Sequence, residues 1–154
     1  LSIIKSVIKS NQERVELLTK RVHKILGNNL KGKKISVLRV TFKPNTDDMR
    51  DSTSLKMIPY LCKQGATVTY YDPSGEKNHF KNLKKCKFKR NLKENCLNAD
   101  LIVLLTEWDE FKSIDFKKLV KKKNFKIYDL RNLYNTEEMK LNKIKYFSIG
   151  RPTN

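Results

Sequence analysis

The sequence has few of the residues on which stapled, metal-bound or membrane proteins depend. Its 154 residues include three cysteines, five glycines, four prolines and one tryptophan. Cys62, Cys86 and Cys96 stand apart, with no pair at zinc-ligand spacing, so we expect neither a zinc site nor a disulfide framework, and a reducing, cytoplasmic setting. No apolar stretch is long enough to span a bilayer and no charged-then-apolar leader is present, so no membrane partner is expected.

Acidic residues are also scarce. The 16 Asp and Glu are outnumbered by 34 Lys and Arg, for a net charge of +18. Such an excess suits a polyanion, and a polyanion-binding protein is one alternative. However, only seven of the basic residues are Arg, and the lysines are spread over many segments. Lys-rich runs at 84–89 and 121–123 lack the interleaved aromatic residues of single-strand-binding proteins. We therefore expect no specific nucleic-acid partner.

Short apolar strands alternate with helical stretches along most of the chain. Its length suffices for one domain with a core. The pattern predicts an α/β fold, a Rossmann-like parallel sheet flanked by helices and preceded by one long N-terminal helix. Gly65 is expected to end the first crossover helix, in which Pro59 predicts a kink or a restart. The stretch 76–95 is the least clearly predicted. Strands are predicted at 34–41, 67–71, 101–105, 125–129 and 144–149.

The N-terminal segment has the pattern of one amphipathic helix. From Ser2 to about Leu26 apolar residues recur at the helical period, and Gly27-Asn28-Asn29 ends the pattern. A helix of this kind cannot bury its apolar stripe alone, so it needs either the α/β body or another chain. A homodimer formed through residues 1–26 is therefore a hypothesis.

The most informative segment is 41–52, Thr-Phe-Lys-Pro-Asn-Thr-Asp-Asp-Met-Arg-Asp-Ser. It follows a predicted strand and precedes a predicted helix, which is where α/β sheets bind ligands. Lys43 offers a compact ammonium group and Arg50 a planar fork that can hold two oxygens. Asp51 or Ser52 is expected to cap the helix, whose first N–H groups would join the site. The segment predicts a phosphate-bearing ligand; the alternative is a solvated turn of mixed charge.

Several further motifs follow in series. They are Gly65-Ala66-x-Val68-x-x-Tyr71-Asp72-Pro73, Ala99-Asp100, Thr106-Glu107-Trp108-x-x-Phe111, Asp129-x-Arg131-Asn132 and Tyr146-x-x-Ile149-Gly150-Arg151. Together with segment 41–52, these motifs resemble the UDP-glucose/GDP-mannose dehydrogenase family over nearly the whole chain, at its C-terminal nucleotide-sugar-binding domain, and most closely the UDP-glucose 6-dehydrogenases. The exact sugar stays open, because relatives that use GDP-mannose or UDP-N-acetyl sugars share the loop.

The resemblance implies a division into two parts. Residues 1–30 would end the central helical domain through which subunits pair, and residues 31–154 would form the UDP-sugar-binding domain. The full enzymes serve polysaccharide biosynthesis and oxidise the C6 alcohol of UDP-glucose to a carboxylate in two NAD-dependent steps, through a Cys-linked intermediate. The sequence contains neither Gly-x-Gly-x-x-Gly nor the family's catalytic Cys motif. We expect a fragment without catalytic residues, inactive without its NAD- and Cys-bearing half.

The resemblance also assigns site residues. Phe42 and Lys43 would line the UDP-sugar site, and Arg131 would donate a charge-assisted hydrogen bond to the same ligand. Arg50 would approach the NAD held by the missing domain. Because Lys43 and Arg131 both follow predicted strands, a parallel sheet would bring them to one edge. Pairing of Arg131 with Asp129 or Asp72 on the surface is the alternative.

Arg39 and Trp108 each bear on the predicted function. Arg39 stands where the family has Gly, at a point where a missing side chain lets backbone and ligand approach closely. This substitution makes a degenerate nucleotide- or partner-binding module without catalysis a second alternative. Trp108 is expected to pack over a strand end and not to stack against a base.

Overall fold

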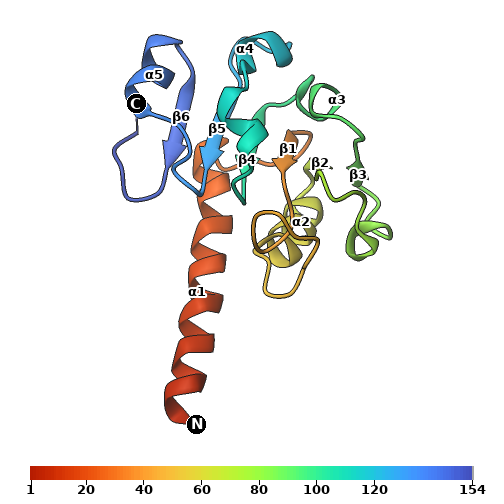
Figure 1. Cartoon of the computed structure of the whole chain (residues 1–154), viewed down its shortest axis with the longest axis vertical. Helices are drawn as coiled ribbons and strands as arrows, with labels where there is room; N and C mark the ends of the chain where they lie inside the picture. The colour runs from red at the N-terminus through yellow and green to blue at the C-terminus, as the bar shows by residue number, and fades with distance from the viewer. Residues whose placement is uncertain (154) are drawn as a thin grey trace.

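Six short strands form one parallel sheet in the computed structural model, which describes residues 1–153 (Figure 1). The strand order is β3-β2-β1-β4-β5-β6, and every neighbouring pair is parallel. The order reverses between β1 and β4, which creates the switch point where such sheets bind ligands. The predicted Rossmann-like sheet is confirmed. The strands are β1 (Lys34–Leu38), β2 (Thr67–Tyr71), β3 (Cys86–Phe88), β4 (Leu101–Leu104), β5 (Lys126–Asp129) and β6 (Lys145–Ser148).

Helices cover both faces of the sheet (Figure 1). α1 and α2 lie on one face, and α3, α4 and α5 lie on the other. The predicted long N-terminal helix is therefore present as α1, followed by short crossover helices. The α-helices are α1 (Ser2–Ile25), α2 (Ser54–Lys63), α3 (Leu92–Cys96), α4 (Phe116–Leu119) and α5 (Thr136–Leu141), and the 3-10 helices are η1 (Asn78–Phe80) and η2 (Asp109–Ser113).

Two hydrophobic cores follow from the alternation of side chains along the strands. Val37 and Val103 pack in the core beneath α1 and α2, whereas Leu38 and Ile102 pack in the core beneath α3, α4 and α5. Successive strand residues point to opposite faces, so a strand buried on both sides must be apolar throughout. This requirement explains the unbroken apolar run of β4, in which all of Leu101–Leu104 is buried.

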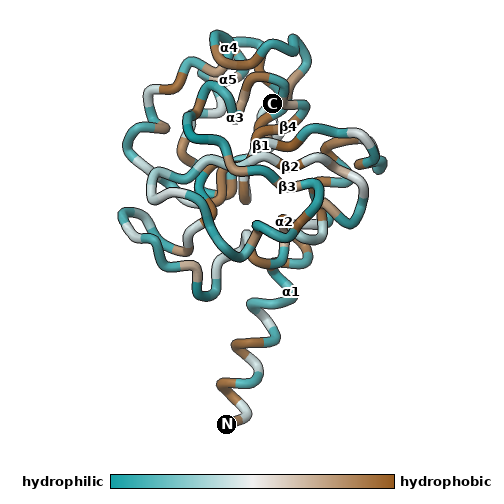
Figure 2. Tube along the Cα trace, turned by 90° about the vertical axis from the view of Figure 1, so that its right-hand side faces the viewer, coloured by the Kyte–Doolittle hydropathy of each residue, from teal (hydrophilic) through white to brown (hydrophobic). Residues whose placement is uncertain are grey.

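Only the C-terminal half of α1 contributes buried side chains to the molecule. Val22 and Ile25 are buried in the core, and the hydroxyl of Tyr128 donates to the carbonyl of Leu18 over 3.1 Å. The N-terminal half projects away from the sheet (Figures 1 and 2). Its apolar side chains, including Ile3 and Ile4, are exposed.

The first crossover helix, α2, ends as its sequence predicts. Gly65 has φ +96°, and the N–H groups of Gly65 and Ala66 donate to the carbonyls of Cys62 and Leu61, both over 3.1 Å. This is a Schellman motif, which favours Gly at the left-handed position. Pro59 lies inside α2, which does not restart there.

Among residues 1–153, no helix is long and apolar enough to cross a membrane. In the same part of the chain, no group of three or more His, Cys, Asp or Glu side chains is placed to hold a metal ion. The cysteines are free thiols, with Cys86 and Cys96 buried.

Candidate functional site

A cavity of about 700 Å³ lies between α1 and the carboxyl ends of β1, β4 and β5. This volume is within the usual range of sites for small ligands and cofactors. Its position is the one that the switch point predicts. The lining residues are Ile8, Asn11, Gln12, Arg14, Val15 and Leu18 from α1; Thr41, Phe42, Asp51, Ser52, Thr53, Leu55 and Lys56 from the loop after β1 and the start of α2; and Leu105, Thr106, Leu130 and Arg131 from the loops after β4 and β5.

The composition of the wall favours an anionic ligand with an apolar part. Arg14, Lys56 and Arg131 contribute three cations, against the single carboxylate of Asp51. Phe42 and several aliphatic side chains supply the apolar surface. Cations and amide groups set among apolar walls are typical of sites that orient a small charged molecule.

The structure places the predicted substrate residues unequally around this cavity. Arg131 was predicted to meet Lys43 at this edge, but the residue that lines the cavity together with Arg131 is Phe42. Lys43 is exposed and is not one of the lining residues, but its ammonium lies 5.7 Å from the centre of the Phe42 ring. The lysine is therefore adjacent to the cavity, within reach of a ligand that extends past Phe42.

Arg131 is anchored by the residue that follows β4 and by the last residue of β5. Its Nε donates to the carbonyl of Leu105 over 3.2 Å, and its backbone N–H donates to Asp129 Oδ1 over 2.9 Å. The surface pairing of its guanidinium with Asp129, considered above as an alternative, is not what the bonds show. Asp129 is fully buried and accepts from the N–H groups of Leu133 and Tyr134 and from the hydroxyl of Tyr146.

Two buried carboxylates hold the loops of the cavity, and the sequence did not reveal this role. Asp129 organises the turn that carries Arg131. Asp72, which follows β2, accepts from the N–H groups of Val40 and Thr41 over 2.9 and 3.4 Å, next to Phe42. Both aspartates stand in motifs of the family resemblance, and a buried carboxylate is stable when it accepts several hydrogen bonds. The place of Asp72 and Asp129 in these motifs was the only indication of this role in the sequence.

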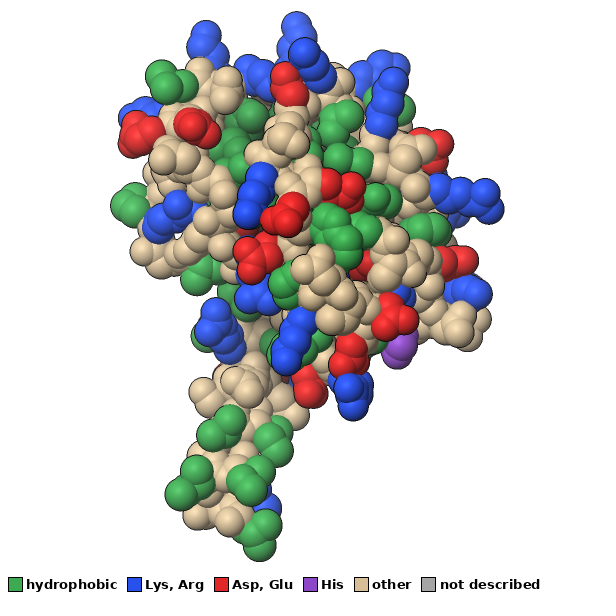
Figure 3. Space-filling view, viewed as in Figure 1, with side chains coloured by type: hydrophobic (Ala, Val, Ile, Leu, Met, Phe, Trp, Pro, Cys, Tyr) green, Lys and Arg blue, Asp and Glu red, His purple; other side chains and the backbone are tan. Residues whose placement is uncertain are grey.

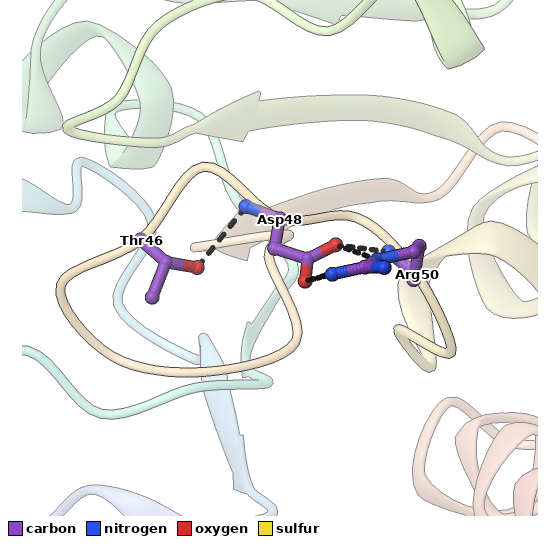
Figure 4. Close-up of polar contacts among 3 residues, drawn as sticks. All are labelled: Thr46, Asp48 and Arg50. Atoms are coloured by element: carbon purple, nitrogen blue, oxygen red, sulfur yellow. Dashed lines mark hydrogen bonds and ion pairs between the residues drawn. The ribbon is translucent and has the colours of Figure 1, made fainter.

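Arg50 lies on the outer side of the loop after β1. Its guanidinium donates from Nε and Nη2 to the carboxylate of Asp48, and the backbone N–H of Asp48 donates to Thr46 Oγ1 (Figure 4). The side chain of Arg50 is 88% exposed and does not line the cavity. The side-chain hydrogen bonds from Arg50 lower the pKa of Asp48 to about 2. The structure thus separates Arg50 from Phe42 and Arg131, which line the cavity.

The expected cap of α2 is present in part. The N-cap position is Thr53, which makes no side-chain cap bond. Ser52 Oγ nevertheless accepts from the backbone N–H of Ser54, the first residue of α2, over 3.2 Å. The Ser52 hydroxyl also donates to the carbonyl of Val40, which Ser54 Oγ contacts over 2.6 Å. Both hydroxyls are buried and tie the start of α2 to the end of β1, an arrangement that depends on tertiary packing.

Arg39 does not enter the cavity, where a large cation in place of Gly was expected to disturb binding. The residue is fully buried and has φ +62°, in the left-handed region that favours Gly. Its guanidinium lies 3.9 Å from the centre of the Trp108 ring. Trp108 packs against the core beneath α3, α4 and α5, as expected. Its ring also makes a cation–π contact with the Arg39 guanidinium.

One protein-family model matches most of the sheet and the loops that border the cavity. Residues 36–136 match the model of the UDP-glucose/GDP-mannose dehydrogenase family, UDP binding domain. The chain belongs to this family. The match begins in β1 and ends at the first residue of α5, so it includes the loops that carry Phe42, Lys43, Arg50 and Arg131.

Curated relatives extend the similarity to α1. The chain is 39% identical to the UDP-glucose 6-dehydrogenase of Rhizobium meliloti in an alignment of length 153 that covers 97% of this chain and 35% of that protein. It is 36% identical to the enzyme of the same name from Rickettsia prowazekii in an alignment of length 151 that covers 96% of this chain and 35% of that protein. The chain therefore spans about a third of the length of these relatives.

Solved structures show the same fold. An NDP-N-acetyl-D-galactosaminuronic acid dehydrogenase from Methanosarcina mazei has a TM-score of 0.73 and 28% identity, covering 90% of this chain and 29% of that one. A UDP-glucose dehydrogenase from Pyrobaculum islandicum has a TM-score of 0.75 over 96% of this chain and 32% of its own, with 22% identity. The second likeness supports the fold alone.

Proposed function

We propose that the cavity binds the nucleotide diphosphate portion of a nucleotide sugar, with UDP-glucose as the leading candidate. The observation that carries the proposal is the cluster of Arg14, Lys56 and Arg131 in a cavity at the carboxyl ends of β1, β4 and β5. A diphosphate matches the excess of cations, and Phe42 offers a flat apolar surface beside them. Lys43, next to Phe42, would add a further cation for the ligand.

The whole enzyme in this proposal is an NAD-dependent UDP-glucose 6-dehydrogenase. NAD would supply the oxidising equivalent in that enzyme. The exposed guanidinium of Arg50 suits contact with an anionic cofactor held by another domain. The sequence has no Gly-x-Gly-x-x-Gly stretch that could hold the pyrophosphate, so the chain alone would bind sugar nucleotide without oxidising it.

Residues 1–30 would then end a helical domain and residues 31–154 form the nucleotide-sugar domain. Apolar side chains gather on the projecting end of α1 (Figure 3). Leu1, Ile3, Ile4 and Val7 are each more than half exposed there. Exposed apolar patches of this kind mark interaction surfaces, and a homodimer formed through residues 1–26 is the partner that we propose.

Positive and negative side chains are mixed on one face of the molecule. On the face shown in Figure 3, Lys and Arg side chains are interspersed with Asp and Glu. A nucleic-acid interface would require a basic stripe. The concentration of cations at the cavity thus favours a small anionic ligand over a polyanion.

Calorimetric titration with UDP and UDP-glucose tests the proposal. We expect saturable binding at one site, with a lower affinity in Arg131→Ala and in Lys43→Ala. Arg90→Ala is the matched control, because Arg90 is exposed and is not a lining residue of the cavity. The absence of heat at millimolar UDP would refute the proposal. A higher affinity for GDP-mannose than for UDP-glucose would reassign the sugar nucleotide.

A further inference from the structure

Arg39 occupies a backbone position that a side chain ordinarily avoids. It directly follows β1, has φ +62°, and is fully buried although it carries a guanidinium group. Its backbone N–H donates to the carbonyl of Tyr71 over 2.8 Å, which fixes the peptide at the end of the sheet. A left-handed conformation and a buried charge both cost free energy, so the contacts of the side chain must compensate.

Those contacts go to the loop that carries Phe42 and Lys43. Nε of Arg39 donates to Thr41 Oγ1 over 2.7 Å. Nη2 donates to the carbonyls of Lys43 and Thr46 over 2.6 and 2.9 Å. Hydrogen bonds from a charged donor in a buried setting are stronger than neutral ones. One side chain therefore fixes the loop at Thr41, Lys43 and Thr46.

The same guanidinium also contacts the loop after β4. The Trp108 ring lies 3.9 Å from the Arg39 carbon Cζ, and Thr106 Oγ1 donates to the carbonyl of Thr41 over 2.6 Å. Burial lowers the pKa of Arg39 below its usual value, and the negative charge of nearby Asp72 offsets only part of this effect. The guanidinium thus lies between the two loops that supply Phe42 and Thr106 to the cavity.

We infer that Arg39 is a positioning residue for nucleotide-sugar binding: it joins the loop after β1 to the Trp108 loop and holds both in the conformation that forms the cavity wall. The inference rests on the proposed function. Arg39 acts through Phe42 and Lys43, because it is not itself one of the cavity-lining residues among residues 1–153. A loop fixed before the ligand arrives saves the entropy of ordering it on binding.

The test combines amide hydrogen exchange without ligand and UDP titration. Arg39→Met removes the donors at similar length, and Arg90→Met is the matched control. The reporters are the N–H of Phe42, which donates to the carbonyl of Asp48 over 2.9 Å, and the N–H of Asp48, which donates to Thr46 Oγ1 over 3.0 Å. We expect faster exchange at both in Arg39→Met, unchanged exchange in β4, and UDP binding weaker by about tenfold or more.

The alternatives give different results. Arg39→Lys keeps the charge without the planar fork and should fall between wild type and Arg39→Met. If Arg39→Met does not fold, Trp108→Leu removes the stacked ring and should also accelerate exchange at Phe42 and Asp48. Unchanged exchange at these amides, or unchanged UDP affinity despite faster exchange, overturns the inference. A wild-type chain that does not bind UDP overturns the proposed function instead, a result that the titration separates from the first two.

Discussion

The guanidinium of Arg131 donates from Nε to the carbonyl oxygen of Leu105 over 3.2 Å. Arg131 follows β5 and Leu105 follows β4, so the bond joins two neighbouring loops in the wall of the cavity. The backbone N–H of Arg131 is held by Asp129 in addition. The side chain is therefore anchored at its base while it borders the cavity.

This anchoring makes Arg131 the most informative residue to remove. Arg131→Ala should lower the affinity for UDP by about 10- to 100-fold, equivalent to about 1.5–3 kcal/mol for a hydrogen bond from a charged donor. The affinity of Arg131→Lys for UDP should lie between those of the wild type and Arg131→Ala, because an ammonium cannot hold two oxygens in one plane. Titration calorimetry measures both. Wild-type affinity in Arg131→Ala would show that the ligand does not use this cation.

The buried Asp129 should matter for stability. It accepts hydrogen bonds from three backbone N–H groups and from the hydroxyl of Tyr146 over 2.6 Å. Asp129→Asn introduces an amide that cannot accept at every position, so the free energy of unfolding should fall by about 1–3 kcal/mol. Urea unfolding measures the loss. Asp115→Asn, at an exposed ion pair with Lys118, should change it by about 0.5 kcal/mol or less.

A loss in Asp129→Asn no larger than that in Asp115→Asn would contradict the structural role of Asp129. UDP affinity of the folded fraction provides a second reading, because a distorted turn would misplace Arg131. A stability loss with unchanged UDP affinity would confine Asp129 to the fold.

The Asp48–Arg50 pair predicts a titration. Hydrogen bonds from Arg50 lower the pKa of Asp48 from 3.8 to about 2, so Arg50→Ala should raise it back toward 3.8. A pKa depressed in the folded state favours folding above the unfolded-state pKa, and the contribution is lost as the pH falls through the folded value. Both groups are exposed, so solvent screening keeps the contribution small.

Carboxyl-detected NMR titration of Asp48 in the two proteins measures this shift. Arg90→Ala, which removes another exposed arginine, is the control and should leave the pKa of Asp48 at its wild-type value. An Asp48 pKa that is the same with and without Arg50 would contradict the pairing in solution.

The projecting half of α1 predicts self-association. Ile4 and Val7 are 60% and 54% exposed. If they pair two copies, Ile4→Glu combined with Val7→Glu should dissociate the dimer, because each buried charge lacks a partner. Light scattering over a range of concentrations measures the mass. Lys5→Glu, a charge change on the same helix that removes no apolar group, is the control, and a monomeric wild type would argue against the dimer.

The long, periodic elements of the fold were predictable from the sequence. The apolar strand Leu101–Leu104 and the amphipathic helix Ser2–Ile25 each extend over enough residues for their period to be recognised. β3 was missed because it has three residues, lies in a Lys-rich stretch and pairs with β2 alone at the edge of the sheet. A strand that short has no pattern of its own and forms because β2 offers free backbone groups.

The sequence by itself determined the alternation of strands and helices, the family motif in 41–52 and the stop at Gly65, because each depends on neighbouring residues. Only the tertiary structure decided that α1 supplies a wall of the cavity, that the Ser52 hydroxyl contacts Val40, and that Arg39 turns inward onto Trp108. These relationships depend on which distant segments the sheet brings together. Burial and hydrogen-bond partners, which local pattern does not specify, then set the direction of each side chain.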